Sequence, residues 1–329
     1  MPAINAPSWF SEETVTVSTA PTCGLTKGGR TLPLLDLKTG ARVMTTDPET
    51  GQPVTAINDV LLDDALALQR GERTRTMRDI PASEVLPRTR VPVYYDRRYH
   101  EQFIAEMKTE RFKGFRSATL AELAESGAIT IRGGHGSPSS GERIGKVPYI
   151  KVSDLRAGFV NINPTNRVPR SIAEAFWKGP SSRLQAFDIL CPERTSKNIG
   201  DFCVLMPGQE QLLLTKEIIV IRPGERAEFD SFYLLWAMTL KIVREQWKRV
   251  IFMQTNREDV GDRYLEIEIP VPNDPEMAAE VSQPFRSYYQ TVAKARTNLG
   301  QYLADSGDHH FFVSDSERDV ETEEEEEEA

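Results

Sequence analysis

The stretch that decides the fold runs from residue 187 to residue 221 and reads FDILCPERTSKNIGDFCVLMPGQEQLLLTKEIIVI. Short apolar runs alternate in it with turns that are rich in Pro, Gly, Ser, Asn and charged residues. Runs of about four to eight residues between such turns are typical of β-strands, whereas helices need longer periodic segments. Similar runs lie upstream, at residues 129–131, 147–152 and 159–162. The pattern predicts an α+β domain built on a curved mixed or antiparallel sheet, and not a doubly wound fold.

Helices are expected on both sides of this strand-rich region. Residues 99–113 have a helical pattern, and Thr119 and Glu122 have the spacing of a capping box at the start of a short helical turn. Residues 228–252 are expected to form one long helix with a single broad apolar face. The apolar positions of that face are Phe232, Leu235, Trp236, Leu240, Val243 and Trp247.

A further long helix is predicted over residues 273–305, after a strand at residues 264–271. Asp274 and Pro275 resemble an N-cap followed by proline at the first helical position, and Pro284 is expected to kink this helix or delay its start. Apolar residues recur in it every three or four positions, which is the spacing of a coiled-coil seam. The seam predicts pairing with a second copy or another partner, and a core helix is the alternative. Its members are Val281, Phe285, Tyr288, Val292, Ala295, Leu299 and Tyr302.

The chain divides by composition into four parts. Residues 1–85 are an N-terminal extension punctuated by Pro and Gly, with a short hairpin at residues 32–45 and a helix capped by Asn58, and they are a candidate arm for a partner. Residues 86–272 form the main body, and residues 273–305 form the long helix. Residues 306–329 are expected to be a disordered acidic tail.

Charge is distributed unevenly along the 329 residues. The net charge is −9, but residues 315–329 alone carry ten acidic residues and one Arg, so residues 1–314 sum to zero. Residues 86–260 carry 27 basic and 20 acidic residues, which makes the middle of the chain mildly basic. A region of this sign could face phosphate groups, although an ordinary protein surface can carry the same excess.

Three further features of the sequence indicate the cellular compartment of the protein. No run approaches the length of a membrane span, and no secretory signal pattern is visible at the start. The three cysteines, Cys23, Cys191 and Cys203, show no metal or disulfide spacing and are expected to be buried free thiols. A cytoplasmic protein without contact to a membrane is expected.

Motifs of common enzymes are missing. The sequence contains no GxxxxGK[ST] loop, no HExxH and no GxSxG. The segment Asn163-Pro164-Thr165-Asn166 lacks the second Pro and the aromatic residue of an amino-methyltransferase loop. We therefore expect no catalytic residue, no cofactor and no metal.

Polar loops between the short strands are the remaining candidates for function. Four of them, near residues 132–143, 167–170, 193–200 and 254–257, offer hydroxyls, amides and guanidinium groups that suit phosphate oxygens and base edges. Any one such loop is more often a solvated turn, but four in the basic region favour a recognition surface for double-stranded DNA. The candidate contacts are Arg132, His135, Ser137, Ser139, Ser140, Lys151, Arg167, Arg170, Arg194, Ser196, Lys197 and Asn256. Asp154 is as well placed to brace a loop as to touch DNA.

The order of several motifs resembles the target recognition domain of the specificity subunits of type I restriction–modification systems. The opening of that domain is matched by residues 133–140, 145–155 and 158–160, and its central strand and turn by residues 187–200. The strand at 217–223, the helix at 229–250 and the segment 266–272 before a long helix follow in the family's order. Residues 94–99 resemble the lead-in of domains fused to methyltransferases. The resemblance covers about residues 90–305, and its ordered series is more specific than any single motif.

This resemblance implies a non-catalytic DNA reader that directs an adenine-specific DNA methyltransferase subunit, with or without a restriction or translocase subunit, to its target site. Family members usually carry two recognition domains and two long helices, whereas this chain has one of each. Either two copies pair through the helix and restore two half-sites, which two-fold geometry favours, or one copy reads a single asymmetric site. Two alternatives stay open: an assembly factor of a phage-defence complex that reads no DNA, and a stand-alone DNA-modifying enzyme.

Overall fold

The computed structural model describes residues 13–85, 91–139, 141, 144–194, 199–252 and 260–306. It divides into two compact units, unit 1 up to Arg97 and unit 2 from Arg98. The division falls after Arg97 rather than after residue 85, because Tyr94 and Tyr95 are buried in unit 1. The acidic tail lies outside the described residues.

Unit 1 is small and built around short antiparallel pairs. Strand β1 (Thr14–Ser18) pairs with β4 (Met77–Pro81), and β2 (Met44–Thr46) forms a hairpin with β3 (Pro53–Thr55). The hairpin expected at residues 32–45 is present in short form: Leu35 and Arg42 form an antiparallel bridge, and the backbone N–H groups of Asp36 and Val43 donate to the carbonyls of Ala41 and Leu34. Its helical segments are α1 (Val60–Gln69), α2 (Ala82–Val85) and the 3-10 turn η2 (Pro92–Tyr95).

Helix α1 is attached to unit 1 by a buried carboxylate. Asp64 accepts hydrogen bonds from the hydroxyls of Ser18, Thr74 and Thr76. Burial would raise the pKa of Asp64, but the three hydroxyl hydrogen bonds outweigh it and hold the pKa below its ordinary value. The N-cap is Asp59 and not the predicted Asn58, whose side chain accepts a hydrogen bond from the Thr22 hydroxyl instead.

The core of unit 2 contains a six-stranded mixed sheet in the order β6-β14-β11-β12-β9-β8. All neighbours in it are antiparallel except β12 and β9, so the predicted mixed α+β fold is confirmed. Its strands are β6 (Ile129–Gly133), β8 (Leu155–Arg156), β9 (Phe159–Val160), β11 (Ile189–Pro192), β12 (Cys203–Val204) and β14 (Ile218–Pro223).

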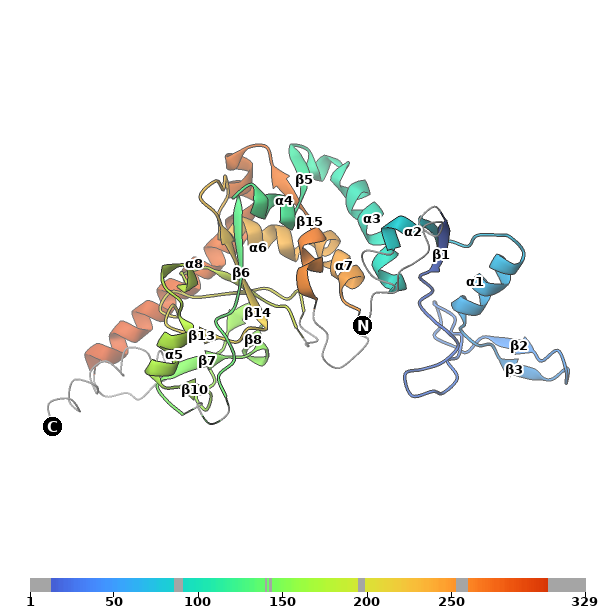
Figure 1. The fold of residues 1–329 in the computed structure, drawn as a ribbon, viewed down its shortest axis with the longest axis horizontal. Helices are drawn as coiled ribbons and strands as arrows, with labels where there is room; N and C mark the ends of the chain where they lie inside the picture. The colour runs from blue at the N-terminus through green and yellow to red at the C-terminus, as the bar shows by residue number, and fades with distance from the viewer. Residues whose placement is uncertain are drawn as a thin grey trace. The chain divides into compact units, whose positions relative to one another are not determined.

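Two smaller sheets complete unit 2. One has the order β10-β7-β13, and the other pairs β5 with β15. Figure 1 shows the first of them at the lower left, beside α5. Their strands are β5 (Phe115–Thr119), β7 (Val147–Ile150), β10 (Arg167–Val168), β13 (Leu213–Leu214) and β15 (Glu268–Pro272).

Several of the predicted helical signals of unit 2 are present. Thr119 and Glu122 form the expected capping box, and Asp274 accepts a hydrogen bond from the backbone of Glu276 at the start of the long helix. The α-helices are α3 (Arg98–Met107), α4 (Leu120–Glu125), α5 (Arg170–Phe176), α6 (Ser231–Thr239), α7 (Lys241–Val250) and α8 (Pro275–Ser306). The short 3-10 turns are η3 (Glu110–Phe112), η5 (Val152–Asp154), η6 (Pro180–Ser182) and η7 (Gly261–Glu266).

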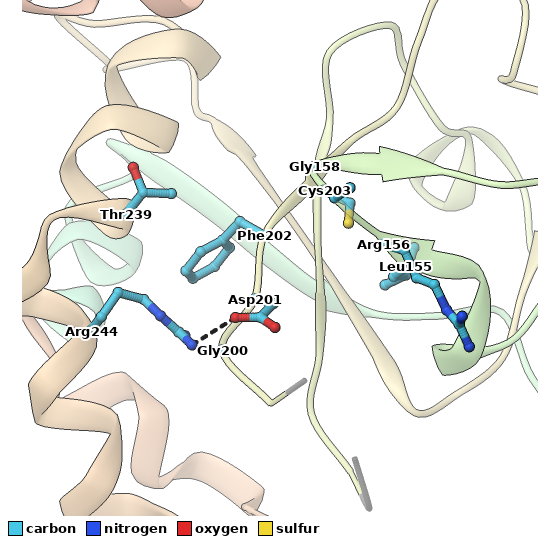
Figure 2. Close-up of a pocket in the computed structure, with 10 residues that line it drawn as sticks. Leu155, Arg156, Gly158, Gly200, Asp201, Phe202, Cys203, Thr239 and Arg244 are labelled. Carbon is cyan, nitrogen blue, oxygen red and sulfur yellow. Dashed lines mark hydrogen bonds and ion pairs between the residues drawn. The ribbon is translucent and has the colours of Figure 1, made fainter. Parts of the chain in front are cut away.

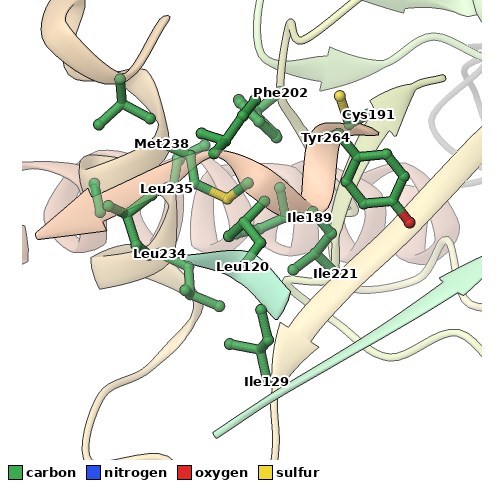
Figure 3. Close-up of a cluster of buried hydrophobic side chains, with 14 of the residues drawn as sticks. Leu120, Ile129, Ile189, Cys191, Phe202, Ile221, Leu234, Leu235, Met238 and Tyr264 are labelled. Carbon is green, nitrogen blue, oxygen red and sulfur yellow. The ribbon is translucent and has the colours of Figure 1, made fainter. Parts of the chain in front are cut away.

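The single long helix expected at residues 228–252 is wrong, because the chain forms α6 and α7 with a break at Leu240. Leu240 has ψ near 136°, which is extended, and the Thr239 hydroxyl bonds back to the carbonyl of Leu235 in the last turn of α6. The break lets α6 be buried on nearly every side, while α7 keeps one polar face. Figure 3 shows Leu234, Leu235 and Met238 of α6 among strand residues of the core.

Helix α8 continues through Pro284 from its predicted start, so the proline does not delay it. The N-terminal half of α8 packs on unit 2, where Ala278, Ser282 and Tyr289 are buried. Three members of the predicted seam, Val281, Phe285 and Val292, are partly buried against the same core. Three others remain exposed, namely Tyr288, Leu299 and Tyr302 at 54%, 43% and 59%. The predicted seam is therefore divided: its first half is largely a core face, as in the alternative, and its second half is uncovered.

The turn between β8 and β9 is held against α8 by Tyr289. Ala157 and Gly158 both have positive φ, at 52° and 79°, and the Tyr289 hydroxyl donates to the carbonyl of Gly158 at 3.1 Å. A Cβ added at Gly158 would lie 2.6 Å from that hydroxyl. The turn therefore requires glycine at this position both for its backbone conformation and for the contact with α8.

We expect Gly158→Ala to lower the free energy of unfolding by about 1–2 kcal/mol, because the new methyl group is strained and displaces Tyr289. Urea unfolding of the purified chain measures this. Ala157→Gly is the matched control and should be neutral or slightly stabilising, since it relieves a strained φ. Equal effects of the two substitutions would contradict this account of the turn.

Candidate nucleic-acid interface

The positive charge of the chain is concentrated in residues 131–183, which contain nine Lys and Arg against three Asp and Glu. This segment supplies β7, β8, β9, β10 and α5. Two of its acidic residues are engaged locally: Asp154 is buried and accepts from the backbone of Lys151, and Glu174 pairs with Arg170. Asp154 therefore braces a loop, and most of the basic charge has no carboxylate within the segment to offset it.

Three of the predicted contacts lie on or next to the three-stranded sheet and α5. Arg167 lies on β10 and donates from Nη1 to the carbonyl of Lys146 at 3.1 Å. Lys151 follows β7, with its Nζ 6.0 Å from the centre of the Tyr149 ring. Arg170 begins α5, with its Nε 3.1 Å from Glu174. All three therefore belong to the stretch of chain that runs from β7 to α5.

Arg132 lies on β6 beside a second arginine of the neighbouring strand. Arg222 binds the buried Asp188 with Nε and Nη2, at 2.8 and 2.5 Å. The same edge of Arg132, its Nε and Nη2, is buried and has no partner. Burial lowers the pKa of Arg132, and the positive charge of Arg222 lowers it further. Both arginines line a cavity of about 580 Å³, and the Nε/Nη2 edge is the fork that binds planar or phosphate acceptors in pairs.

His135 is not a DNA contact, because both of its ring nitrogens are engaged inside unit 2. Nδ1 accepts from the backbone N–H of Leu214, and Nε2 lies 2.9 Å from the carbonyl of Ser182, to which it donates. This pattern requires the neutral ring with its proton on Nε2. Burial lowers the pKa of His135 to about 4, with a small opposing effect of the Ser182 hydrogen bond. The residue joins three segments and is structural.

The remaining predicted contacts are spread over the domain. Ser137 hydrogen-bonds the hydroxyl of Thr215 at 3.1 Å, Ser139 is exposed, and Arg194 is half-buried just after β11. The structure does not bring Arg194 onto the small sheet with Lys151. Four predicted contacts lie outside the described residues, namely Ser140, Ser196, Lys197 and Asn256.

A second cleft lies between α7 and the β8–β9 hairpin, and Figure 2 shows its residues. It encloses about 600 Å³, with Arg244 on one side and Arg156 on the other. Arg244 binds Asp201 at 2.8 Å, while its Nη1 and the indole N–H of Trp247 are buried without a partner. The motif search did not select these residues, because a lone Arg or Asp in sequence carries no signal of such a cleft.

The three cysteines are free thiols in the part of the chain that the structure describes. Cys191 and Cys203 are buried as expected, and burial raises the pKa of Cys203 to about 11. Cys23 is exposed, contrary to expectation. Over the described ranges, no group of three or more His, Cys, Asp or Glu could hold a metal ion. None of the helices in those ranges combines the length and the hydropathy needed to cross a membrane.

Comparison with known proteins gives structural similarity without sequence similarity. No protein-family model matches the sequence, and no curated protein matches it. The chain resembles the HsdS subunit from Thermoanaerobacter tengcongensis, with 14% identity and a TM-score of 0.36 over 68% of this chain and 55% of that one. It also resembles the type I restriction–modification S subunit from M. genitalium, with 14% identity and a TM-score of 0.34 over 64% of this chain and 50% of that one.

A third similar structure is the type IIG restriction endonuclease BpuSI, with 10% identity and a TM-score of 0.42. That match covers 68% of this chain and 33% of the endonuclease. The chain thus spans between a third and about half of the length of these structures. Two of the three are S subunits, the family that the motif order resembles. Since all three TM-scores are below 0.5, the functional proposal rests on this chain's own residues.

The neutral state of His135 predicts a pH dependence of stability. The folded pKa near 4 lies below the unfolded value near 6.5, so the unfolded chain binds more protons between these values and stability falls as pH falls. Between pH 7 and pH 5 this single group should cost about 2 kcal/mol. Urea unfolding at both pH values measures it. In His135→Gln the difference between the two pH values should shrink by that amount, and an unchanged difference would refute the assignment.

Proposed function

We propose that the chain is a non-catalytic DNA-recognition subunit that binds double-stranded DNA through the segment 131–183. The observation that carries the proposal is the excess of basic residues in this segment of the sequence, which has nine Lys and Arg against three Asp and Glu and so a net charge of +6. Cations on such a surface attract phosphates and position the protein on a duplex without reading sequence. An acid-rich or evenly charged segment would offer no such surface.

Sequence reading would then come from donors beside this surface. Arg132 is one such donor: its Nε and Nη2 are buried without a partner, so the side chain would have to move outward before this edge could bind the guanine O6/N7 edge or a phosphate. Ser137 and Ser139 precede the small sheet in the chain, and their hydroxyls can either donate or accept a hydrogen bond. One bidentate contact to a base contributes about 1–3 kcal/mol of discrimination.

This DNA-recognition subunit is proposed to direct an adenine-specific DNA methyltransferase subunit to its target site. Any restriction or translocase subunit would be directed to the same site. Support comes from the ordered motifs at residues 133–160, 187–200 and 217–223, which lie on one domain in the structure. The chain's own residues supply binding and orientation, and the methyltransferase would supply the chemistry.

A second copy is proposed to pair through the uncovered C-terminal half of α8. Tyr288, Leu299 and Tyr302 follow the heptad spacing and are exposed, whereas Phe285 and Val292 are already used by the core. Pairing would place two recognition domains on one DNA, related by a two-fold axis.

A methylation map of the host genome by long-read sequencing tests the function. Deletion of the gene should remove modification at one motif everywhere, and the wild-type gene should restore it. Lys151→Ala with Arg170→Ala should restore it only in part, since the loss of two phosphate contacts weakens DNA binding about ten-fold or more.

Lys38→Ala with Arg42→Ala removes the same charge from unit 1 and is the matched control, which should restore the motif fully. An unchanged map after deletion would reject DNA targeting and favour the assembly-factor alternative. Equal effects of the two double variants would reject the segment 131–183 as the binding surface.

Leu299→Glu with Tyr302→Glu should convert a dimer to a monomer in sedimentation experiments without loss of helical signal, because both side chains are exposed. Val281→Glu is the contrasting variant and should lower the melting temperature, because Val281 packs on the core. A wild-type chain that is monomeric at tens of micromolar would exclude self-pairing through this helix.

A further inference from the structure

Most of the exposed large hydrophobic side chains in the described part of the chain belong to its smaller unit. Over the described residues, fourteen such side chains are exposed, and ten of them lie in unit 1. Soluble monomers seldom expose many apolar side chains together, and a contiguous patch of this kind marks a binding surface.

Helix α1 accounts for four of the ten, and it is turned with its apolar face outward. At about 100° per residue, Leu61, Leu62, Leu66 and Leu68 cover an arc of about 160° on one side of the helix. The opposite side carries Asp64 and Ala67, which are buried at 2% and 3% exposure. The leucines are 42–52% exposed. A helix whose carboxylate faces inward and whose leucines face outward is the reverse of an ordinary surface helix.

The inward face of α1 is fixed, so the helix cannot rotate to hide its leucines. Asp64 accepts from three hydroxyls of other segments, and the backbone N–H of Leu61 donates to the carbonyl of Thr22. Rotation of α1 would take the Asp64 carboxylate away from the three hydroxyls. Several hydrogen bonds to a charged group would then be lost. The apolar face is therefore a stable feature of unit 1.

The patch extends beyond the helix at its N-terminal end. Ile57 and Leu25 are 54% and 55% exposed, and a Cβ added at Gly24 would lie 3.3 Å from Ile57. Segment 22–25 therefore runs beside the start of α1, and Leu25 and Ile57 continue the surface. The "leucine face" is defined here as Leu25, Ile57, Leu61, Leu62, Leu66 and Leu68.

Charge around the leucine face selects the kind of partner. Residues 59–69 contain three Asp and no Lys or Arg. Asp63 is exposed, Asp59 is half-buried at the N-cap of α1, and Asp64 is buried. The first cation after the helix in the sequence, Arg70, is paired with Glu72 at 3.0 Å. An acidic rim repels nucleic acid and anionic lipid. It also opposes a second copy, because a two-fold contact would bring the same Asp residues together.

We infer that the leucine face of α1 is a docking surface for a different protein, whose apolar helix or groove is rimmed by Lys and Arg. An amphipathic helix placed in an apolar groove is a common mode of protein recognition, and opposite rims fix its register. The inference goes beyond the proposed DNA recognition and stands on unit 1 alone, so either can fail without the other.

Binding of helical peptides to the full chain tests the inference. The first probe has a leucine stripe with Lys/Arg flanks, the second has the same stripe with Glu flanks, and the third keeps the basic flanks but replaces the leucines by Ser. Fluorescence anisotropy should show the first probe binding at least ten-fold more tightly than either of the others. The third probe reports any binding to the acidic tail, which is the same in every variant.

Two variants locate the site. Leu62→Gln with Leu66→Gln should weaken the first probe at least ten-fold, whereas Leu37→Gln, at a fully exposed turn position, should not. Asp63→Lys should shrink the preference for basic over acidic flanks. All substituted side chains are exposed, so unchanged circular dichroism is expected.

Three results would overturn the inference. One is equal binding of the first and second probes, and another is unchanged binding of the first probe by the Leu62/Leu66 double variant. The third is a dimer that the same double variant converts to a monomer in sedimentation, which would assign the leucine face to a second copy.

Discussion

Burial of α6 on nearly every side is the constraint on which the arrangement of unit 2 depends. One surface of this helix packs in the main core with strand residues such as Ile189 and Ile221, and its Tyr233 hydroxyl donates to the carbonyl of Pro270 on β15. Helix α8, which follows later in the chain, covers another side of α6, and its Tyr289 ring stacks near the Phe232 ring of α6. Because α6 has little polar surface to leave in water, it has to be covered from several directions. That requirement uses the first half of α8, whereas Leu299 and Tyr302 in the second half stay exposed.

The same requirement explains which parts of the fold could be predicted from sequence. Sequence patterns that predict one specific local hydrogen bond were reliable. The capping box at Thr119 and the start of α8 at Asp274 occur where they were expected. The break at Leu240 was missed, because the apolar periodicity of α6 and α7 together resembles one face of one helix. Only the three-dimensional demand to bury α6 on all sides distinguishes the two cases.

Prediction of the candidate site was limited in a different way. Residue type and position in a polar loop selected Arg167, Arg170 and Lys151, which lie on β10, at the start of α5 and just after β7. The same reasoning selected His135, whose partners are the backbone of Leu214 and Ser182, distant in sequence. Backbone groups have no sequence signature, so a structural histidine and a recognition histidine look alike. The ion pair of Asp188 and Arg222, which sets the surroundings of Arg132, was invisible for the same reason.

The outward leucines of α1 have a consequence for how firmly unit 1 is folded. A unit that leaves these side chains in water forgoes part of the apolar burial that normally offsets the loss of chain entropy. Any protein that covers them binds the folded form and not the unfolded one, so it adds stability that grows with its concentration. At a free concentration one hundred times the dissociation constant the gain is about 2.7 kcal/mol. The melting temperature of unit 1 is then a property of the complex as much as of the chain, and its abundance in the cell would follow that of its partner.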